Sequence, residues 1–286
     1  MKEVGRLTMG WQGQVLKYSA LLDKRNFLAP VPDNEAPRYE FHQEKAAQPV
    51  GKAMIVGVSS RRSIGFGIAE HLADHGWDTV VTTRRKDKFM QISQRHDVRE
   101  LDYTGSFEDL DGLDDVTGLV YCIAKSSVTT TKGLLGTSRE EFLQTMSDSC
   151  YSYIAVIDEA LKRNPNIKSI VGLSFLGGEK VIPGYDAIGV AKAALEQTNR
   201  ILASELGARG IRANIVSAGS LRTPASRVLP DFSKVHSILS RRSFLKRPVT
   251  TEEIAGSVEF LLSDASGGMT GEVLYVNGGL NHSMML

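Results

Sequence analysis

The sequence predicts a single α/β domain built on a doubly wound, mainly parallel sheet, and three observations support this fold class. The chain has 286 residues, of which 42% are hydrophobic and 23% charged, enough for one full core but too few for two large domains. From residue 52 onward, short apolar runs alternate with stretches of helical periodicity. The first two apolar runs, with a glycine-containing turn and a helical stretch between them, fit within about 30 residues. This is the length of a βαβ unit.

The predicted elements follow that alternation to the end of the chain. The first βαβ unit consists of a strand at 53–57, a helix at 63–75 and a β-rich run at 79–83. Such a unit makes its two strands parallel and its crossover right-handed. We predict further strands at 98–101, 118–123, 169–173, 213–216 and 273–276, and further helices at 139–161, 185–206 and 251–262.

Residues 1–49 differ from this pattern and are predicted to form an N-terminal extension to the main domain at 50–286. A short amphipathic helix is expected at 11–22, followed by a proline-containing linker at 29–37. Acidic residues in the extension do not suit a transit peptide. We expect an arm that packs on the body of the protein or on a neighbouring subunit.

Composition excludes several classes of function. The net charge of +1 gives no reason to expect a nucleic-acid partner. Two cysteines offer no disulfide framework, and no apolar run reaches the roughly 18 residues of a membrane span, so a cytoplasmic protein is expected. His71 and His75 have helical i,i+4 spacing, but the sequence shows no third ligand, so we expect an exposed helix face and no metal.

The turn after the first strand contains Gly57, Gly65 and Gly67. In a βαβ unit the pyrophosphate of a dinucleotide binds at the N-terminus of the helix, where free backbone N–H groups and the helix dipole favour an anion. Gly57 allows the sharp turn, and the other two allow close approach of backbone and cofactor. The spacing departs from G-x-G-x-x-G, so a plain glycine-rich loop is the alternative to a Rossmann-like dinucleotide site.

Arg84 and Arg85 follow the second strand, where NAD-selective enzymes usually place an acidic residue for the ribose 2′-hydroxyl. Arginine there can form charge-assisted hydrogen bonds to a 2′-phosphate. The position therefore favours NADPH over NADH, and a solvated charge run is the alternative.

Tyr185 and Lys192 are seven residues apart, about two turns of one helix face. An ammonium group within a few ångströms favours the phenolate, so the pair is expected to lower the pKa of Tyr185 and make it a proton donor. An ordinary amphipathic helix is the alternative.

With these motifs in order, the chain from about Lys52 to Gly279 resembles the short-chain dehydrogenase/reductase superfamily. Within it, the chain resembles the divergent branch of enoyl-acyl-carrier-protein reductases of bacterial fatty-acid synthesis. The segments that carry the resemblance are 57–67, 174–192, 212–219, 221–223 and 263–279.

The resemblance implies roles for individual residues. Tyr185 would donate a hydrogen bond to the thioester carbonyl and stabilise the enolate, and Lys192 would hold the nicotinamide ribose. The remaining residues implied to contact the cofactor are Gly57, Ser63 and Ile64 at the pyrophosphate and ribose, Asp102 and Tyr103 at the adenine, Ile123 and Ala124 at the ribose, and Gly219, Leu221 and Thr223 near the nicotinamide.

Three departures from the family pattern concern the substrate. Phe175 stands where most bacterial members have a second tyrosine. Lys125 follows Ala124 where a glycine and an apolar residue are usual, and it either reaches a substrate carboxylate or phosphate or extends to solvent. The segment 103–117 is shorter and more acidic than its counterpart. These departures suggest a paralogue with a specialised substrate, such as one of secondary metabolism.

A helical substrate lid is expected at about 224–246. Its apolar side chains are predicted to form a wall for an acyl chain: Val228, Leu229, Phe232, Val235, Ile238, Leu239, Phe244 and Leu245. Arg241, Arg242, Lys246 and Arg247 form a basic cluster that either attracts an acidic carrier protein or is a solvated helix end.

The predicted function is NADPH-dependent reduction of the C=C bond of an enoyl thioester carried by acyl carrier protein or CoA. A ketoreductase is the first alternative, although it would place the lysine at Gly189 and a serine at Gly172. A non-catalytic nucleotide-binding protein is the second. The resemblance also implies a homodimer or homotetramer built through the Tyr185 helix and the last strand.

Overall fold

The computed structural model describes residues 50–86, 94–103, 107–125, 133–226 and 231–283. By its internal contacts the chain separates into Met1–Ala46 and Ala47–Leu286, and the described residues all belong to the second unit. The N-terminal extension predicted at 1–49, with its short helix, lies outside the described residues. None of the helices in the part that the structure describes is both long and apolar enough to span a membrane.

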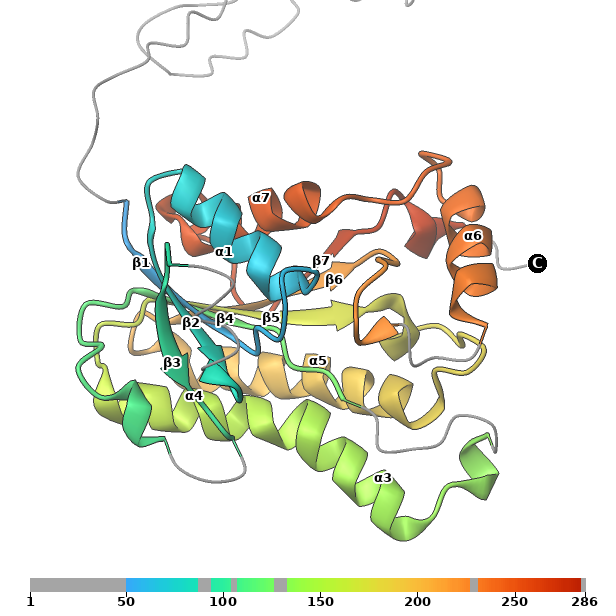
Figure 1. Ribbon diagram of the computed structural model, residues 1–286, viewed down its shortest axis with the longest axis horizontal. Helices are drawn as coiled ribbons and strands as arrows, with labels where there is room; N and C mark the ends of the chain where they lie inside the picture. Colours follow the sequence, from blue (N-terminus) through green and yellow to red (C-terminus); the bar gives the residue numbers. More distant parts are fainter. Residues whose placement is uncertain (1–49, 87–93, 104–106, 126–132, 227–230, 284–286) are drawn as a thin grey trace, which may run out of the picture. The chain divides into compact units, whose positions relative to one another are not determined.

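Seven parallel strands form one sheet in the order β3-β2-β1-β4-β5-β6-β7 (Figure 1). The order reverses between β1 and β4, which makes this the switch point where open α/β sheets bind ligands at their carboxyl edge. The doubly wound parallel sheet predicted from the sequence is therefore confirmed. The strands are β1 (Lys52–Val56), β2 (Asp78–Thr83), β3 (Asp97–Glu100), β4 (Gly118–Tyr121), β5 (Ser169–Phe175), β6 (Arg212–Ala218) and β7 (Val273–Val276).

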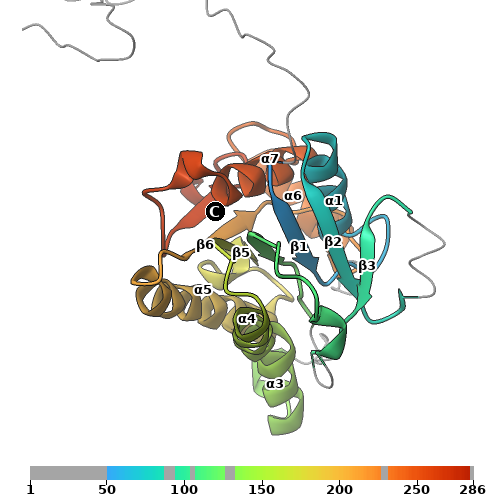
Figure 2. The same ribbon diagram turned by 90° about the vertical axis from the view of Figure 1, so that its left-hand side faces the viewer.

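Helices cover both faces of the sheet. α1 (Ile64–Asp74) and α7 (Thr251–Leu262) lie on one face, and α4 (Ser152–Arg163) and α5 (Asp186–Gly207) lie on the other (Figures 1 and 2). The strands alternate between the two resulting cores: Ala53 and Ile55 pack in the core under α1 and α7, whereas Met54 and Val56 pack in the core under α4 and α5. Burial on both sides explains the continuous apolar runs of the sequence.

The helix predicted at 139–161 contains an interruption. α3 (Arg139–Met146) is joined to α4 by one π-helical turn, Ser147–Tyr151. A π-turn inserts an extra residue and is often found at functional sites. Here it buries two polar residues, Asp148 and Ser149.

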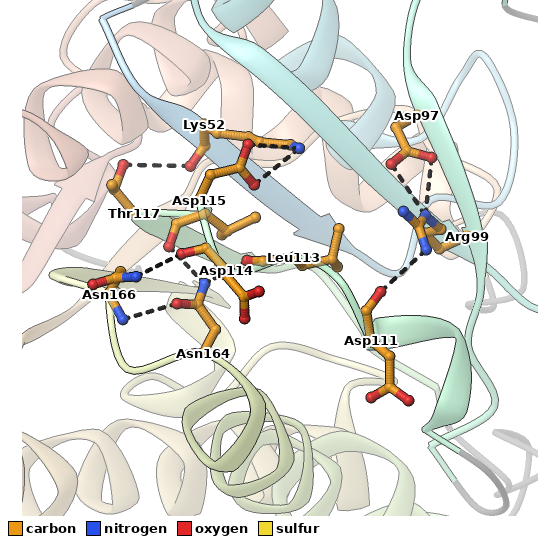
Figure 3. Close-up of polar contacts among 11 residues, drawn as sticks. Lys52, Asp97, Arg99, Asp111, Leu113, Asp114, Asp115, Thr117, Asn164 and Asn166 are labelled. Atoms are coloured by element: carbon orange, nitrogen blue, oxygen red, sulfur yellow. Dashed lines mark hydrogen bonds and ion pairs between the residues drawn. The ribbon is translucent and has the colours of Figure 1, made fainter.

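The acidic segment before β4 is anchored at the amino edge of the sheet. It forms a short 3-10 turn, η1 (Glu108–Leu110), and then passes beside the turn after α4. Asn164 donates hydrogen bonds of 2.7 Å to the carbonyl oxygens of Leu113 and Val116, and Lys52 forms an ion pair of 3.0 Å with Asp115 (Figure 3). These contacts fix the entry to β4 at the edge opposite to its functional end.

Candidate active site

A cavity of about 510 Å³ opens at the carboxyl edge of the sheet, and the segments that follow β1 to β6 line it. This volume is typical of a site for a small molecule or cofactor. Apart from Gly67 and the predicted lid, which are described below, all but Asp102 of the residues predicted to bind cofactor or substrate line the cavity: Gly57, Ser63, Ile64, Arg84, Arg85, Tyr103, Ile123, Ala124, Lys125, Phe175, Tyr185, Lys192, Gly219, Leu221 and Thr223. Asp102 is exposed to solvent and is not part of this lining.

The turn after β1 has the geometry of a phosphate loop. Gly57 has a φ of 94°, and a Cβ atom there would lie 2.6 Å from the Cγ1 atom of Ile123. Only glycine fits this position without strain, and its absent side chain leaves backbone facing the cavity. Ser63 caps α1 by accepting a hydrogen bond from the Phe66 N–H, which fixes the helix N-terminus beside the cavity.

Of the other two glycines of that turn, Gly67 does not approach the cofactor site as predicted. A Cβ atom on Gly67 would lie 2.2 Å from the Cγ2 atom of Thr251 in α7. Gly67 therefore permits the close packing of α1 on α7. Gly65 lines the cavity and is packed against Val58 and Ile55.

A basic pair faces the cavity at the end of β2. Arg84 and Arg85 are exposed and line the cavity, and the backbone N–H of Arg85 is held by the Thr83 hydroxyl at 3.3 Å. The next cation of the run, Lys86, lies 3.6 Å from Asp109 instead. The two arginines are thus placed where a group on the adenosine half of a dinucleotide would lie.

Lys192 is buried, with 3% of its surface exposed, and its ammonium group donates a hydrogen bond of 2.7 Å to the carbonyl oxygen of Leu173 in β5. Burial disfavours the charged form and lowers the pKa of Lys192 to about 8. Tyr185 directly precedes the first residue of α5, so both side chains reach the same cavity from one helix.

The lowered pKa expected for Tyr185 is wrong. Burial raises the pKa of the Tyr185 phenol above its ordinary value, and Glu196 adds to that rise. Burial is the larger cause, because it disfavours the charged phenolate. Tyr185 is consequently a neutral phenol that can donate a hydrogen bond.

The Tyr185 ring is fixed by two neighbours. Phe175 contacts it edge to face, with ring centroids 5.0 Å apart. A Cβ atom on Gly177 would lie 2.2 Å from the Cδ1 atom of Tyr185, so the ring packs directly on the backbone there. Sequence reasoning missed Gly177, although the Gly-Gly pair before Tyr185 is a visible signal. It also missed Glu196, which is buried and accepts a hydrogen bond from the Ser174 hydroxyl.

Lys125 lines the cavity, but its ammonium group lies 2.9 Å from the carboxylate of Asp148. The side chain is 47% exposed, so it touches both solvent and a buried acid. Neither of the two roles considered for it from sequence included this partner. A direct contact of Lys125 with substrate stays a prediction.

The lid is only partly as predicted. Its helix, α6 (Phe232–Arg242), contributes Phe232 to the cavity lining, while Leu239 packs against Leu176 and Leu280 outside that cavity. Phe244 and Leu245 are 61% and 55% exposed because α6 ends before them. The predicted apolar wall is therefore wrong for these side chains, and Val228 and Leu229 lie outside the described residues.

The basic cluster at the end of α6 is divided. Arg247 forms an ion pair of 2.6 Å with Glu253. Its positive charge is therefore balanced and adds little to the cluster that was predicted to attract an acidic carrier protein. Arg241 and Lys246 are exposed, and Arg242 is half-buried.

Within α6, His236 is buried and its ring lies 3.0 Å from the hydroxyl of Ser220, which lines the cavity.

The two histidines of α1 behave differently from each other. His75 is exposed as predicted, but His71 lies 2.9 Å from Glu259 of α7. The potential metal-binding atoms of His71, His75 and Glu259 lie within 4.8 Å of one another. Glu259 of α7 is therefore a third possible ligand that the spacing of the two histidines did not reveal. We interpret the His71–Glu259 contact as a hydrogen bond that joins the two helices.

The positions that a ketoreductase would use have no room for side chains. A Cβ atom on Gly189 would lie 2.7 Å from the carbonyl oxygen of Gly177. A Cβ atom on Gly172 would lie 2.6 Å from the Cδ1 atom of Ile215 and 3.4 Å from the Tyr153 hydroxyl. The site therefore accommodates its lysine seven residues after the tyrosine and not four.

The parallel sheet, the glycine turn and the Tyr185–Lys192 pair in one cavity define a dinucleotide-binding reductase of the short-chain dehydrogenase/reductase type. A family model described as enoyl-(acyl carrier protein) reductase matches residues 57–281. With this match, the chain belongs to the enoyl-acyl-carrier-protein reductase family of NAD(P)H-dependent oxidoreductases, and the resemblance inferred from sequence is confirmed.

Individual relatives agree with this assignment. The enoyl-acyl-carrier-protein reductase (NADH) FabI of Bacillus cereus is 34% identical, covering 80% of this chain and 96% of that protein. The NADPH enzyme of Staphylococcus aureus is 33% identical, covering 80% of this chain and 95% of that protein. A crystal structure of the Bacillus cereus reductase with NADP+ and indole naphthyridinone has a TM-score of 0.77 at 31% identity, and covers 84% of this chain and all of that one.

Proposed function

We propose that this protein is a cytoplasmic NADPH-dependent enoyl-thioester reductase that reduces the C=C bond of a substrate carried by acyl carrier protein or CoA. The observation that carries the proposal is the placement of a neutral Tyr185 and a buried Lys192 on one dinucleotide-sized cavity. The closed positions at Gly172 and Gly189 favour this reaction over ketone reduction.

In the proposed reaction, Tyr185 donates a hydrogen bond to the thioester carbonyl oxygen. Negative charge develops on that oxygen as the β-carbon is reduced, and a fixed donor aimed at it lowers the barrier. Phe175 and Gly177 hold the ring in place, so little reorganisation is needed. The bound dinucleotide supplies the hydride.

The chain offers a binding surface for each part of that dinucleotide. Gly57 and the N-terminus of α1 would hold the pyrophosphate, and Lys192 would hold the nicotinamide ribose. Tyr103 would lie at the adenosine end and Gly219, Leu221 and Thr223 at the nicotinamide end of the cofactor, and all four residues line the cavity. Gly57 supports this fit because its left-handed φ and the close approach of Ile123 require glycine, which leaves backbone facing the cavity.

The preference for NADPH rests on Arg84 and Arg85. Both line the cavity at the end of β2 without an acidic residue at that position. Most of the relatives that we compared carry NADH in their names, and the Staphylococcus aureus enzyme carries NADPH. Arg84 and Arg85 are the feature of this chain that supports use of NADPH.

A homodimer or homotetramer is part of the proposal. Tyr151 and Ile154 on the α4 side, and Val190 and Ile201 on α5, are large apolar side chains exposed on the outer face of those helices. Tyr275 of β7 is also partly exposed. Burial of such side chains between subunits would be favourable. Light scattering of the purified protein measures the assembly directly.

Phe175 and Lys125 support a specialised substrate. Both line the cavity, and the resemblance to the family implies other residues at these two positions in most members. We therefore propose a paralogue role such as one in secondary metabolism. A panel of enoyl thioesters of different chain length and polarity tests this. A plain preference for short apolar chains on acyl carrier protein would contradict it.

The function itself is tested by the fate of the label from deuterated NADPH. With a short trans-2-enoyl thioester, mass spectrometry should find a saturated product carrying one deuterium at the β-carbon. A 3-hydroxy product from the matching 3-ketoacyl thioester would support the ketoreductase alternative. Tight binding of NADPH with no product from either substrate would support a non-catalytic nucleotide-binding protein.

A further inference from the structure

A buried carboxylate links two walls of the cavity without lining it. The side chain of Asp148, in the π-turn, is 1% exposed. It accepts hydrogen bonds from the Gln144 amide at 2.9 Å and from the Tyr103 hydroxyl at 3.4 Å, and it lies 2.9 Å from the Lys125 ammonium. A buried carboxylate is costly unless hydrogen-bond donors or a positive charge compensate it. Breaking the contacts of Asp148 with these three side chains is therefore unfavourable.

The π-turn also holds the backbone of Lys125. The hydroxyl of Ser149 accepts a hydrogen bond of 2.9 Å from the Lys125 N–H and donates one of 2.7 Å to the Lys125 carbonyl. Two consecutive residues of the turn therefore fix the main chain and the side chain of the same cavity residue. This double contact places Lys125 more precisely than an ion pair alone.

The two cavity residues that meet at Asp148 come from distant strands. Tyr103 follows β3 and Lys125 follows β4, and β2 and β1 lie between those strands in the sheet. Three strand spacings of about 4.8 Å separate β3 from β4, about 14 Å in all. The sheet itself cannot join the two segments, whereas Asp148 can because it approaches from the helical layer beneath them.

Tyr103 can act only as a donor in this network. Burial and the nearby carboxylate of Asp148 both raise the pKa of the Tyr103 phenol. Its hydroxyl is thus protonated at neutral pH and directed toward Asp148, which leaves the ring as part of the cavity wall. At this end of the sheet, that wall faces the adenosine half of a bound dinucleotide.

We propose that Asp148 is a positioning residue that holds the Tyr103 ring rigidly against the adenosine half of the dinucleotide and fixes Lys125 in the adjoining part of the cavity wall. This inference rests on the proposed function, because it assumes that the cavity binds a dinucleotide. Preorganised walls increase affinity by reducing the ordering that binding requires. Loss of Asp148 should therefore weaken adenosine-containing ligands and affect the chemistry at Tyr185 much less.

The first test measures the affinities of NADPH and of 2′-phospho-ADP-ribose, which lacks the nicotinamide. The variant Asp148→Asn keeps the size of the side chain and its acceptor oxygen but loses the charge that pairs with Lys125. Both ligands should bind about tenfold more weakly, by the same factor. The KM for NADPH should rise by that factor, while kcat changes far less.

A double variant separates positioning from simple stability. Lys125→Met alone leaves a buried carboxylate unpaired and should lower the melting temperature. Lys125→Met combined with Asp148→Leu removes both charges and should recover much of the melting temperature but not the affinity. Recovery of affinity together with stability would overturn the proposal, because the pair would then be purely structural.

The ion pair of Lys52 and Asp115 provides the matched control. Its atoms are 3.0 Å apart, compared with 2.9 Å in the Lys125–Asp148 pair. Figure 3 shows the Lys52–Asp115 pair, and neither of these two residues lines the cavity. Lys52→Met should leave both affinities unchanged. Wild-type affinities retained in a folded Asp148→Asn variant would refute the positioning role alone, whereas a wild-type protein that binds no dinucleotide would refute the proposed function as well.

Discussion

The Lys192 ammonium group donates a hydrogen bond of 2.7 Å to the carbonyl oxygen of Leu173, at the end of β5 where the cavity begins. The backbone of the sheet thereby fixes a buried cation beside the site of the proposed chemistry. The same burial that lowers the pKa of Lys192 raises that of Tyr185, so the two groups tend toward their neutral forms. Their roles depend on pH in ways that can be measured.

Activity should decrease as the pH rises through about 8, the pKa of folded Lys192, if its charged form holds the cofactor. Stability should show the opposite trend. Between about 8 and the ordinary value of 10.5, the unfolded chain binds more protons than the folded one, so the free energy of unfolding contributed by Lys192 rises with pH. Steady-state rates and thermal unfolding across this range test both trends. Constant activity well above pH 8 would contradict the role of the charged form.

Tyr185→Phe should lower kcat by about 10²–10³-fold and leave NADPH affinity nearly unchanged, because only the oxyanion donor is lost. Tyr275→Phe is the matched control: its hydroxyl donates to Glu179 at 2.7 Å and is not part of the cavity lining. Steady-state kinetics and cofactor titration separate the two effects. A Tyr185→Phe variant with the wild-type rate would exclude Tyr185 as the donor.

Arg84→Ala and Arg85→Ala should each raise the KM for NADPH by about tenfold and alter the KM for NADH little, since only NADPH carries the 2′-phosphate. Arg99→Ala serves as the control, because that guanidinium is engaged with Asp97 at 3.0 Å and is not among the residues lining the cavity. Parallel kinetics with both cofactors give the answer. An equal effect on the two cofactors would remove the basis for NADPH selectivity.

The attachment of α6 should weaken in acid. Burial and the positive charge of Arg222 lower the pKa of His236, so the folded state binds fewer protons than the unfolded one below the ordinary value of 6.5. The stability contributed by His236 is thus present above that value and decreases as the pH falls through it. Hydrogen exchange of α6 at neutral and mildly acidic pH, corrected for intrinsic rates, measures the change.

His236→Leu should abolish that pH dependence in α6, because it removes both the ionisable ring and its contact with Ser220. His96 is also buried with a lowered pKa, but it bonds Glu70 of α1 and should affect α1 and not α6. An α6 exchange rate that still depends on pH in the variant would assign the effect to another group.

Much of the fold could be predicted from the sequence because strands buried on both faces appear as continuous apolar runs and the helices show apolar periodicity. α7 and β7 have the predicted bounds. In α7, Thr250 and Glu253 form a capping box that the local sequence specifies. Predictions that depend only on the residues within one local segment, such as the bounds of a helix or strand, were therefore reliable.

The remaining features depend on contacts between distant residues. Nothing in the run around Asp148 indicates that a π-turn buries it, since its donors Tyr103 and Lys125 are more than 20 residues away. The sign of the Tyr185 shift required the burial of the phenol, which spacing along a helix does not reveal. The apolar wall was overestimated because the lid pattern does not show where α6 ends.

The most direct test of the account is NADPH oxidation, followed by absorbance, with a short trans-2-enoyl thioester beside the matching 3-ketoacyl thioester. We expect NADPH to be consumed with the enoyl substrate, faster than NADH, and not with the ketoacyl substrate. Consumption with the ketoacyl substrate alone would mean that the cavity performs carbonyl reduction despite the closed positions at Gly172 and Gly189. That result would contradict the proposed reaction while leaving the dinucleotide site intact.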